Sequence, residues 1–290
     1  MWIMSIATAG AMNPSNNGLR VWVNGELAEP GEKRISVTDH GLIVGDGVFE
    51  ALKVTSAGGF AVTRHLDRLS RSAEALGLPA PDHDQLRAGI EAVLAGRDWE
   101  LGKIRITYTG GEGPLGSPPA FGPVTVVVAS SPAEAPDAVT QIVTTPWLRN
   151  EAGAMTGVKT TSYAENVRGL KYALDRDASE GIFVNTAGNV SEGTGSNIFF
   201  VFGDEIVTPP MSAGPLAGIT RAVVGEWCRI TERDLTLDRA QQADEVFITS
   251  STRDVQSVDR WDDAVFPASG PVTKQVAQTF AVRSEADIDP

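Results

Sequence analysis

The chain has 290 residues, a length that suits one large domain or two ordinary ones. Hydrophobic residues make up 42% and charged residues 21%, as in a soluble globular protein. The net charge of -13 argues against a nucleic acid or an anionic membrane as partner, because phosphate-rich partners favour basic surfaces.

The N-terminal residues and the cysteine content indicate the compartment. Residues 1–18 lack the basic start and sustained apolar core of a secretory signal, so we interpret them as a flexible leader. No apolar run approaches the roughly 20 residues of a membrane span. Cys228 is the only cysteine, so no disulfide can form within the chain, which fits a reducing cytoplasm.

The first half of the chain predicts strands followed by two helices. Asn24-Gly25 lies between two short alternating runs and predicts a hairpin. Two further strand-like runs follow in residues 34–62. Residues 63–78 carry apolar side chains at helical spacing and end at a glycine, which predicts a helix, and residues 82–96 predict a second one. Strands are expected at residues 103–110 and 123–130.

Residues 131–138, rich in proline, alanine and acids, predict a linker. Beyond it we expect two kinds of element, strands at 140–148, 180–210 and 244–263, and helices at 161–178, 221–230 and 271–282. The pattern therefore predicts two α+β domains, a small one at residues 19–130 and a larger one at 139–290.

Lys159 and Glu192 suggest the chemistry of pyridoxal phosphate. Lys159 precedes the helix predicted at residues 161–178, and its amine can form a Schiff base with the cofactor aldehyde. Glu192 lies in a hairpin rich in glycine, serine and asparagine, and its carboxylate can keep the pyridine nitrogen protonated. Each residue alone is weak evidence, because most lysines are solvated surface residues.

A phosphate group needs positive charge and N–H or O–H donors, and three segments offer them. His65 and Arg68 share a helix face, although a surface arginine is the commoner case. Gly218-Ile219-Thr220 precedes a helix whose N–H groups could meet an anion, or Thr220 simply caps it. Ser250, Ser251 and Thr252 end a strand with three hydroxyls, which also fits an ordinary polar turn.

Other chemistries have little support in the sequence. The three histidines, at positions 40, 65 and 83, show no paired spacing, so we predict no metal site. The glycine-rich stretch at residues 110–116 lacks the lysine and hydroxyl ending of a nucleotide-binding loop. No GxSxG sequence of a serine hydrolase is present.

Taken together, these segments resemble the class IV aminotransferase family, the fold-type-IV pyridoxal-phosphate enzymes. Six matching segments follow one another in family order over nearly the whole chain: DHGLIVGDGVFEALKV (39–54), RHLDRL (64–69), GVKTTSY (157–163), SEGTGSNIFF (191–200), LAGITR (216–221) and TSSTRDVQSV (249–258). The resemblance implies a two-domain α+β fold with the cofactor between the domains. It also implies a homodimer in which a loop of the partner subunit closes the site.

The resemblance assigns roles to residues that match the family motifs. Lys159 would be the Schiff-base lysine and proton shuttle, and Glu192 would pair with the pyridine nitrogen. Arg68, Ile219, Thr220 and Ser251 would bind the cofactor phosphate. Tyr163 would hydrogen-bond the phenolic oxygen of the cofactor. The expected substrate pocket comprises Val44, Phe49, Gly110 and Thr252.

Four segments, at residues 21–32, 37–54, 105–117 and 159–166, are most similar to bacterial 4-amino-4-deoxychorismate lyases. Such a lyase releases pyruvate and gives 4-aminobenzoate for folate synthesis. The alternative is a transaminase that acts on branched-chain amino acids, D-amino acids or (R)-amines. A non-catalytic binding protein of the same fold is the remote alternative, and it has no need for Lys159, Glu192 and Arg68 together.

Two positions depart from the family pattern. Gly110 falls where D-amino-acid aminotransferases and some lyases carry an arginine for the substrate carboxylate, which weakens the D-amino-acid prediction. Arg105, Arg149 or Arg168 could take over that role. Val44 falls where other members often have an aromatic residue, so we expect a roomier pocket that suits a ring-containing substrate.

Overall fold

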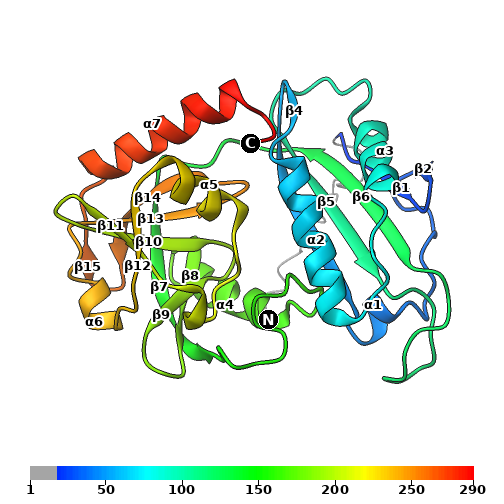
Figure 1. Ribbon diagram of the computed structural model, residues 1–290, viewed down its shortest axis with the longest axis horizontal. Helices are drawn as coiled ribbons and strands as arrows, with labels where there is room; N and C mark the ends of the chain where they lie inside the picture. The colour runs from blue at the N-terminus through cyan, green and yellow to red at the C-terminus, as the bar shows by residue number, and fades with distance from the viewer. Residues whose placement is uncertain (1–17) are drawn as a thin grey trace, which may run out of the picture.

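The computed structural model describes residues 18–290, so the predicted leader lies, except for Gly18, outside the described residues. Two β-sheets, each with helices packed on it, lie side by side (Figure 1). The smaller sheet with α2 and α3 is built from the first half of the chain, and the larger sheet from the second half. This is the two-domain α+β fold that the sequence predicts.

The smaller sheet has six antiparallel strands in the order β2-β1-β6-β5-β3-β4. Its strands are β1 Arg20–Val23, β2 Glu26–Ala28, β3 Gly47–Thr55, β4 Gly58–Gly59, β5 Gly102–Thr109 and β6 Thr125–Pro132. The predicted hairpin is confirmed, since β1 and β2 pair around Asn24-Gly25 and both turn residues have positive φ, as such a turn requires.

Three helices accompany this sheet: α1 His40–Ile43, α2 Val62–Leu76 and α3 His83–Leu94. Helix α2 buries its apolar stripe against β3 and ends at Gly77, whose φ of 74° is the left-handed conformation that glycine adopts easily. The side chain of Asp82 caps α3 by accepting from two backbone N–H groups of its first turn.

The alternation of side chains along β3 positions the site. Val48, Leu52 and Val54 face α2 and α3 and belong to the core of this half. Phe49, Ala51 and Lys53 point to the other face, toward the larger sheet. The sequence of β3 therefore supplies both a core and one wall of the space between the two halves.

The larger sheet is mixed, in the order β12-β11-β10-β13-β14-β7-β8-β9, with β15 paired to β14. Its strands are β7 Val139–Arg149, β8 Glu180–Asn185, β9 Val190–Gly193, β10 Asn197–Phe202, β11 Glu205–Thr208, β12 Ile230–Glu232, β13 Glu245–Ser250, β14 Asp254–Trp261 and β15 Ala264–Val265. The strands β8 and β10 are almost entirely buried, which explains their continuous apolar runs.

The helices of this half are α4 Ala164–Leu174, α5 Ile219–Trp227, α6 Leu237–Ala240 and α7 Pro271–Ala286, with a 3-10 turn at Met211–Ala213. Helix α4 packs on β7 and β8, while α5 and α7 pack on β13. The C-terminal residues return to the smaller half, where the Asp289 side chain accepts from Thr63 at the start of α2. Within residues 18–290, no helix combines the length and the apolar character needed to cross a bilayer.

Several predicted boundaries were wrong. The helix expected at 161–178 spans only Ala164–Leu174, because Thr161 N donates to Gly47 O and is thereby tied to β3. Residues 131 and 132 of the predicted linker belong to β6, and the chain crosses between the sheets in residues 133–138. The short helices α1 and α6 were not predicted, because one turn gives too little periodicity.

Candidate active site

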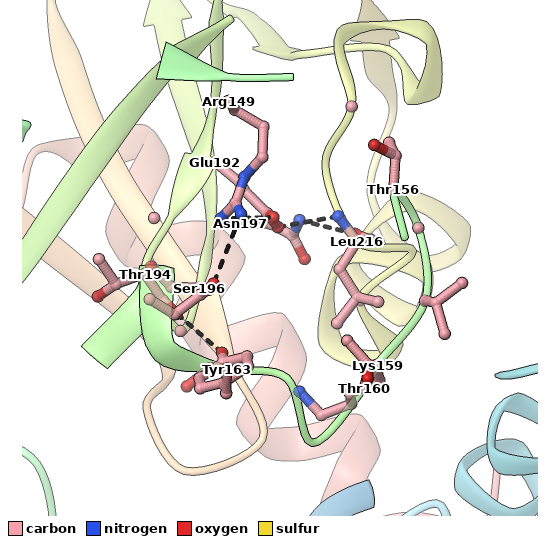
Figure 2. A pocket seen from close by; sticks show the side chains of 18 of the residues that line it. Arg149, Thr156, Lys159, Thr160, Tyr163, Glu192, Thr194, Ser196, Asn197 and Leu216 are labelled. Atoms are coloured by element: carbon pink, nitrogen blue, oxygen red, sulfur yellow. Dashed lines mark hydrogen bonds and ion pairs between the residues drawn. The ribbon is translucent and has the colours of Figure 1, made fainter. Parts of the chain in front are cut away.

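A cavity of about 370 Å³ lies between the two halves of the molecule, and Figure 2 shows the side chains around it. Its walls come from α2, the segment 153–163, the β9–β10 turn, the start of α5 and the β13–β14 turn. Eight of the sequence-predicted residues line it: Arg68, Lys159, Tyr163, Glu192, Ile219, Thr220, Ser251 and Thr252. The fold therefore gathers residues that are up to 184 positions apart in the sequence.

Lys159 lies in an extended segment that is fastened to the smaller sheet. Its backbone oxygen accepts from Phe49 N at 2.9 Å, and its N–H donates to Ser72 Oγ at 3.3 Å. The ammonium nitrogen lies 4.5 Å from the centre of the Phe49 ring. Burial and the nearby Arg68 guanidinium lower the pKa of Lys159 to about 8, so a substantial fraction of the amine is neutral near pH 7–8.

Glu192 leaves β9 toward the same cavity. Its Oε2 accepts a hydrogen bond from Leu216 N at 2.8 Å, and its Oε1 lies 3.4 Å from Arg149 Nη2. Figure 2 shows Arg149 and the Leu216 segment converging on this carboxyl. Burial raises the pKa of Glu192, while Arg149 acts in the opposite direction.

Arg68 is held in place by a buried carboxylate. Glu50 points from β3 toward α2 and accepts from Arg68 Nε and Nη2, each at 2.7 Å, and it bonds His65 Nδ1 at 2.6 Å. Arg68 Nη1 donates to Ala217 O at 2.9 Å. Burial would raise the pKa of Glu50, but Arg68 and His65 outweigh it and hold that pKa at about 2. Two of the five guanidinium N–H donors have no acceptor among residues 18–290 and can meet an anion in the cavity.

The start of α5 and the end of β13 form a cradle of donors. In residues 18–290 no side chain caps α5, so the N–H groups of Ile219 and Thr220 open toward the cavity. The hydroxyls of Ser250, Ser251 and Thr252 stand beside them. At Gly218 a Cβ would meet Asn197 Oδ1 at 1.9 Å, so only glycine allows this close approach.

Tyr163 contacts both its own half and Phe49. Its hydroxyl donates to Thr194 O at 2.8 Å, and its ring meets the Phe49 ring edge-on at 5.2 Å between centres. Burial raises the pKa of this phenol to about 12, so it is a hydrogen-bond donor over the whole physiological range. The predicted contact with the phenolic oxygen of a cofactor stays a prediction.

The four predicted substrate-pocket residues do not come together. Thr252 lines the cavity, and Phe49 lies under Lys159 Nζ. Val44 and Gly110 instead line a second cavity of about 560 Å³, which adjoins the first along Met155, Thr160 and Ser162. Gly110 is fixed there because its N–H donates to Asp46 O at 3.0 Å.

Sequence reasoning missed two groups at the site. Glu50 was read only as part of a strand, although a glutamate among apolar strand residues is a signal for a buried charge pair. The segment 153–157 was not singled out, and its glycine, alanine and threonine residues carry no distinctive pattern. Arg149 was considered only as a substrate anchor, whereas the structure places it beside Glu192.

The donors and acceptors of the cavity match three of the polar groups of pyridoxal phosphate. An amine with a lowered pKa suits the aldehyde, the α5 cradle with Arg68 suits the phosphate, and Glu192 suits the ring nitrogen. Two buried hydroxyls in the cavity wall, those of Ser196 and Thr249, have no hydrogen-bond partner within the described residues, as expected where a polar ligand belongs. The residues present therefore fit this cofactor.

Comparison with known proteins agrees with this fit. A model of the family "Amino-transferase class IV" matches residues 47–261. A putative branched-chain-amino-acid aminotransferase of Methanocaldococcus jannaschii is 30% identical over 275 residues, covering 90% of this chain and 95% of that protein. A D-alanine aminotransferase of Bacillus licheniformis is 29% identical over 274 residues, covering 89% and 94%.

Solved structures give the same family. The branched-chain amino acid aminotransferase of Escherichia coli has a TM-score of 0.84 and 26% identity, covering 91% of this chain and 93% of that chain. A putative 4-amino-4-deoxychorismate lyase of Legionella pneumophila has a TM-score of 0.81 and 24% identity, covering 88% and 96%. Fold and site thus define a two-domain fold-type-IV enzyme that uses pyridoxal 5'-phosphate. The chain belongs to the class IV aminotransferase family.

Proposed function

We propose that the protein is a transaminase, which moves an amino group between an amino acid and a 2-oxo acid, and that Lys159 carries the cofactor. The observation that supports this most is the place of Lys159. Its amine, with a pKa lowered to about 8, shares one cavity with the Glu192 carboxyl and the α5 donor cradle. A neutral amine at that point can act as a base at the α-carbon of a bound amino acid.

The division of labour follows from the positions of the groups. The α5 N-terminus, Arg68 and Ser251 would hold the phosphate, and Glu192 would pair with the ring nitrogen, because all of them line the same cavity. The bound cofactor supplies an electron sink for the α-carbon, while the residues around it bind, orient and move protons. Because Arg68 is fixed by Glu50, little side-chain entropy is lost when the phosphate arrives.

Of the three arginines that could hold a substrate carboxylate, Arg105 suits the role best. Register pairs Arg105 with Ala51, so its guanidinium reaches diagonally over the Phe49 ring, at 3.9 Å from the ring centre. Arg105 is exposed, and within residues 18–290 its side-chain hydrogen bond is to Thr107 Oγ1 at 3.2 Å. Partial desolvation lowers its pKa, as expected for a cation without a carboxylate partner. Arg149 is engaged with two glutamates, and Arg168 lies over the Trp147 ring.

The donor we favour is an L-amino acid with an apolar side chain. The first curated relative described above is named for branched-chain amino acids. D-Alanine aminotransferases are close relatives too, but the absent guanidinium at Gly110 argues against a D-amino acid. The adjoining second cavity offers Val44, Leu76 and Leu78 as apolar surface for a side chain.

The lyase that the sequence favoured is the second candidate. Its support is the similarity of four sequence segments to bacterial lyases. The solved structure named as a putative lyase, at 24% identity, supports the fold alone. The curated relatives described above are named as transaminases. A non-catalytic binding protein would not require an amine with a lowered pKa facing a buried carboxylate.

One experiment separates these functions. The purified protein with added cofactor would be given L-leucine, L-valine, D-alanine or an (R)-amine, each with 2-oxoglutarate or pyruvate as acceptor, and in parallel 4-amino-4-deoxychorismate. We expect the L-branched-chain donors to react fastest. Stoichiometric 4-aminobenzoate and pyruvate without amino transfer would identify the protein as a lyase. If no substrate is turned over, the non-catalytic binding protein is the function that remains.

We also propose a homodimer. Helix α4 exposes Val167, Leu170 and Leu174 by 62%, 37% and 57%, and these three positions form one stripe along the helix. A second copy of the chain is the occupant expected for such a stripe next to the site. Sedimentation should give twice the monomer mass, and replacing Val167 and Leu174 by glutamate should give the monomer.

A further inference from the structure

Arg149, at the end of β7, has an arrangement that the proposed function does not yet use. Its side chain is 13% exposed, and its guanidinium lies over the Phe183 ring at 4.2 Å from the ring centre. Nη1 donates to Glu165 Oε2 at 2.5 Å. Among residues 18–290, Nε and Nη2 are buried and have no hydrogen-bond partner, and Nη2 lies 3.4 Å from Glu192 Oε1 (Figure 2).

Buried N–H groups without partners are costly, so their retention here calls for a reason. A role as substrate anchor fits poorly, because Glu165 and Glu192 already flank the guanidinium and two carboxylates repel a third. Stacking on Phe183 fixes the plane of the guanidinium. The edge of the guanidinium that carries Nη2 is therefore held facing the Glu192 carboxyl.

We propose that Arg149 is a positioning residue for Glu192, keeping its carboxyl ionised so that the shared proton rests on the cofactor ring nitrogen. This inference rests on the proposed function. A buried carboxyl beside a pyridine nitrogen has two arrangements, a neutral one with the proton on oxygen and an ionic one with the proton on nitrogen. Burial favours the neutral arrangement, and a neighbouring fixed cation favours the ionic one.

The charges around Glu192 agree with this assignment. Burial raises the pKa of Glu192, and Arg149 is the strongest of the groups that act against this, followed by the Leu216 N–H and by Lys159. Glu180 acts in the opposite direction, but it is engaged by Gly195 N at 3.0 Å and by the Thr194 hydroxyl. Lys159 is the group that changes during the reaction, so Arg149 is the permanent cation next to this carboxyl.

The test uses the holoenzyme loaded with pyridoxal phosphate that carries ¹⁵N in the ring. The ¹⁵N chemical shift reports whether the ring nitrogen is protonated. We expect a protonated nitrogen in the wild type at neutral pH, an unprotonated one in Glu192→Gln, and a shift toward the unprotonated signal in Arg149→Met. Turnover of Arg149→Met should fall about tenfold or more in kcat with KM little changed, because a pKa change of one unit moves the proton equilibrium tenfold.

Two further variants separate this role from a structural one. Arg149→Lys keeps the cation and should restore most of the protonated signal. Arg239→Met is the matched control, since Arg239 also stacks on a phenylalanine, Phe202, at 4.3 Å from the ring centre, but lies at the surface away from the cavity. It should leave the ¹⁵N signal and kcat unchanged.

The outcomes are distinct from a failure of the proposed function. If the wild type does not bind the cofactor, the proposed function itself is refuted. If the wild type binds cofactor but its ring nitrogen is unprotonated at neutral pH, the role of Arg149 is refuted. This result needs only the wild type, so it stands even if Arg149→Met does not fold. A fully protonated ring nitrogen in Arg149→Met, with unchanged kcat, would refute it as well.

Discussion

Replacing Glu50 by glutamine tests whether a buried charge pair holds the phosphate-binding arginine. Glu50 is fully buried and accepts both Arg68 donors at 2.7 Å. Its pKa falls from 4.5 to about 2, and at 1.36 kcal/mol per pKa unit this corresponds to about 3 kcal/mol of stability. Glu50→Gln leaves Arg68 buried without its counter-charge, which typically costs about 3–5 kcal/mol. We therefore expect a loss of about 3 kcal/mol in the free energy of unfolding at pH 7.

The pH dependence of this loss gives the sharper test. The folded-state pKa of Glu50 is depressed, so its contribution is complete above about pH 4.5 and disappears as the pH falls through about 2. Urea unfolding of the apo-protein, followed by tryptophan fluorescence, should show the gap between wild type and Glu50→Gln shrinking from pH 5 to pH 3. The control Glu74→Gln changes an exposed carboxyl on α2 and should cost less than about 0.5 kcal/mol. A gap below 1 kcal/mol at pH 7, or one that stays constant with pH, would refute the reasoning.

Two further predictions concern cofactor capture. With the pKa of Lys159 at about 8, the rate at which apo-protein binds pyridoxal phosphate covalently should rise about tenfold per pH unit below 8 and level off above it. Stopped-flow absorbance measures this rate, and a rate that goes on rising through pH 9 without levelling off would contradict the lowered pKa. Gly218→Ala should weaken cofactor affinity at least about tenfold, because the new Cβ would meet Asn197 Oδ1 at 1.9 Å and displace the α5 cradle. The control Gly116→Ala lies outside the cavity and adds a Cβ that meets Pro118 Cδ at 3.4 Å, an ordinary contact distance, and equal affinities of the two variants would contradict the prediction.

Local sequence signals predicted the parts of the fold that depend on local structure. The Asn24-Gly25 turn needs only positive φ at two positions, and the α2 periodicity is read directly from Leu66 and Leu69. The helix after Lys159 was predicted too long, because a hydrogen bond from Thr161 N to Gly47 O, 114 residues away in sequence, competes with the first turn. No local pattern contains that competitor.

The same reasoning applies to the site. Motif order identified the cavity residues because a family resemblance carries long-range information that residue spacing lacks. It did not place Val44 and Gly110, whose cavity is set by how α1 and the 110–124 segment pack beside α2. It also did not reveal that Arg149 faces Glu192, since that contact joins β7 to β9 across the sheet.

Identifying the lysine that bears the cofactor tests the central claim most directly. The holoenzyme would be reduced with borohydride, which makes the bond between lysine and cofactor permanent, then digested and analysed by mass spectrometry. The account predicts one pyridoxyl-modified peptide, with the modification on Lys159, and no modification in Lys159→Ala. A modification on another lysine, or none in a protein that has bound the cofactor, would contradict it.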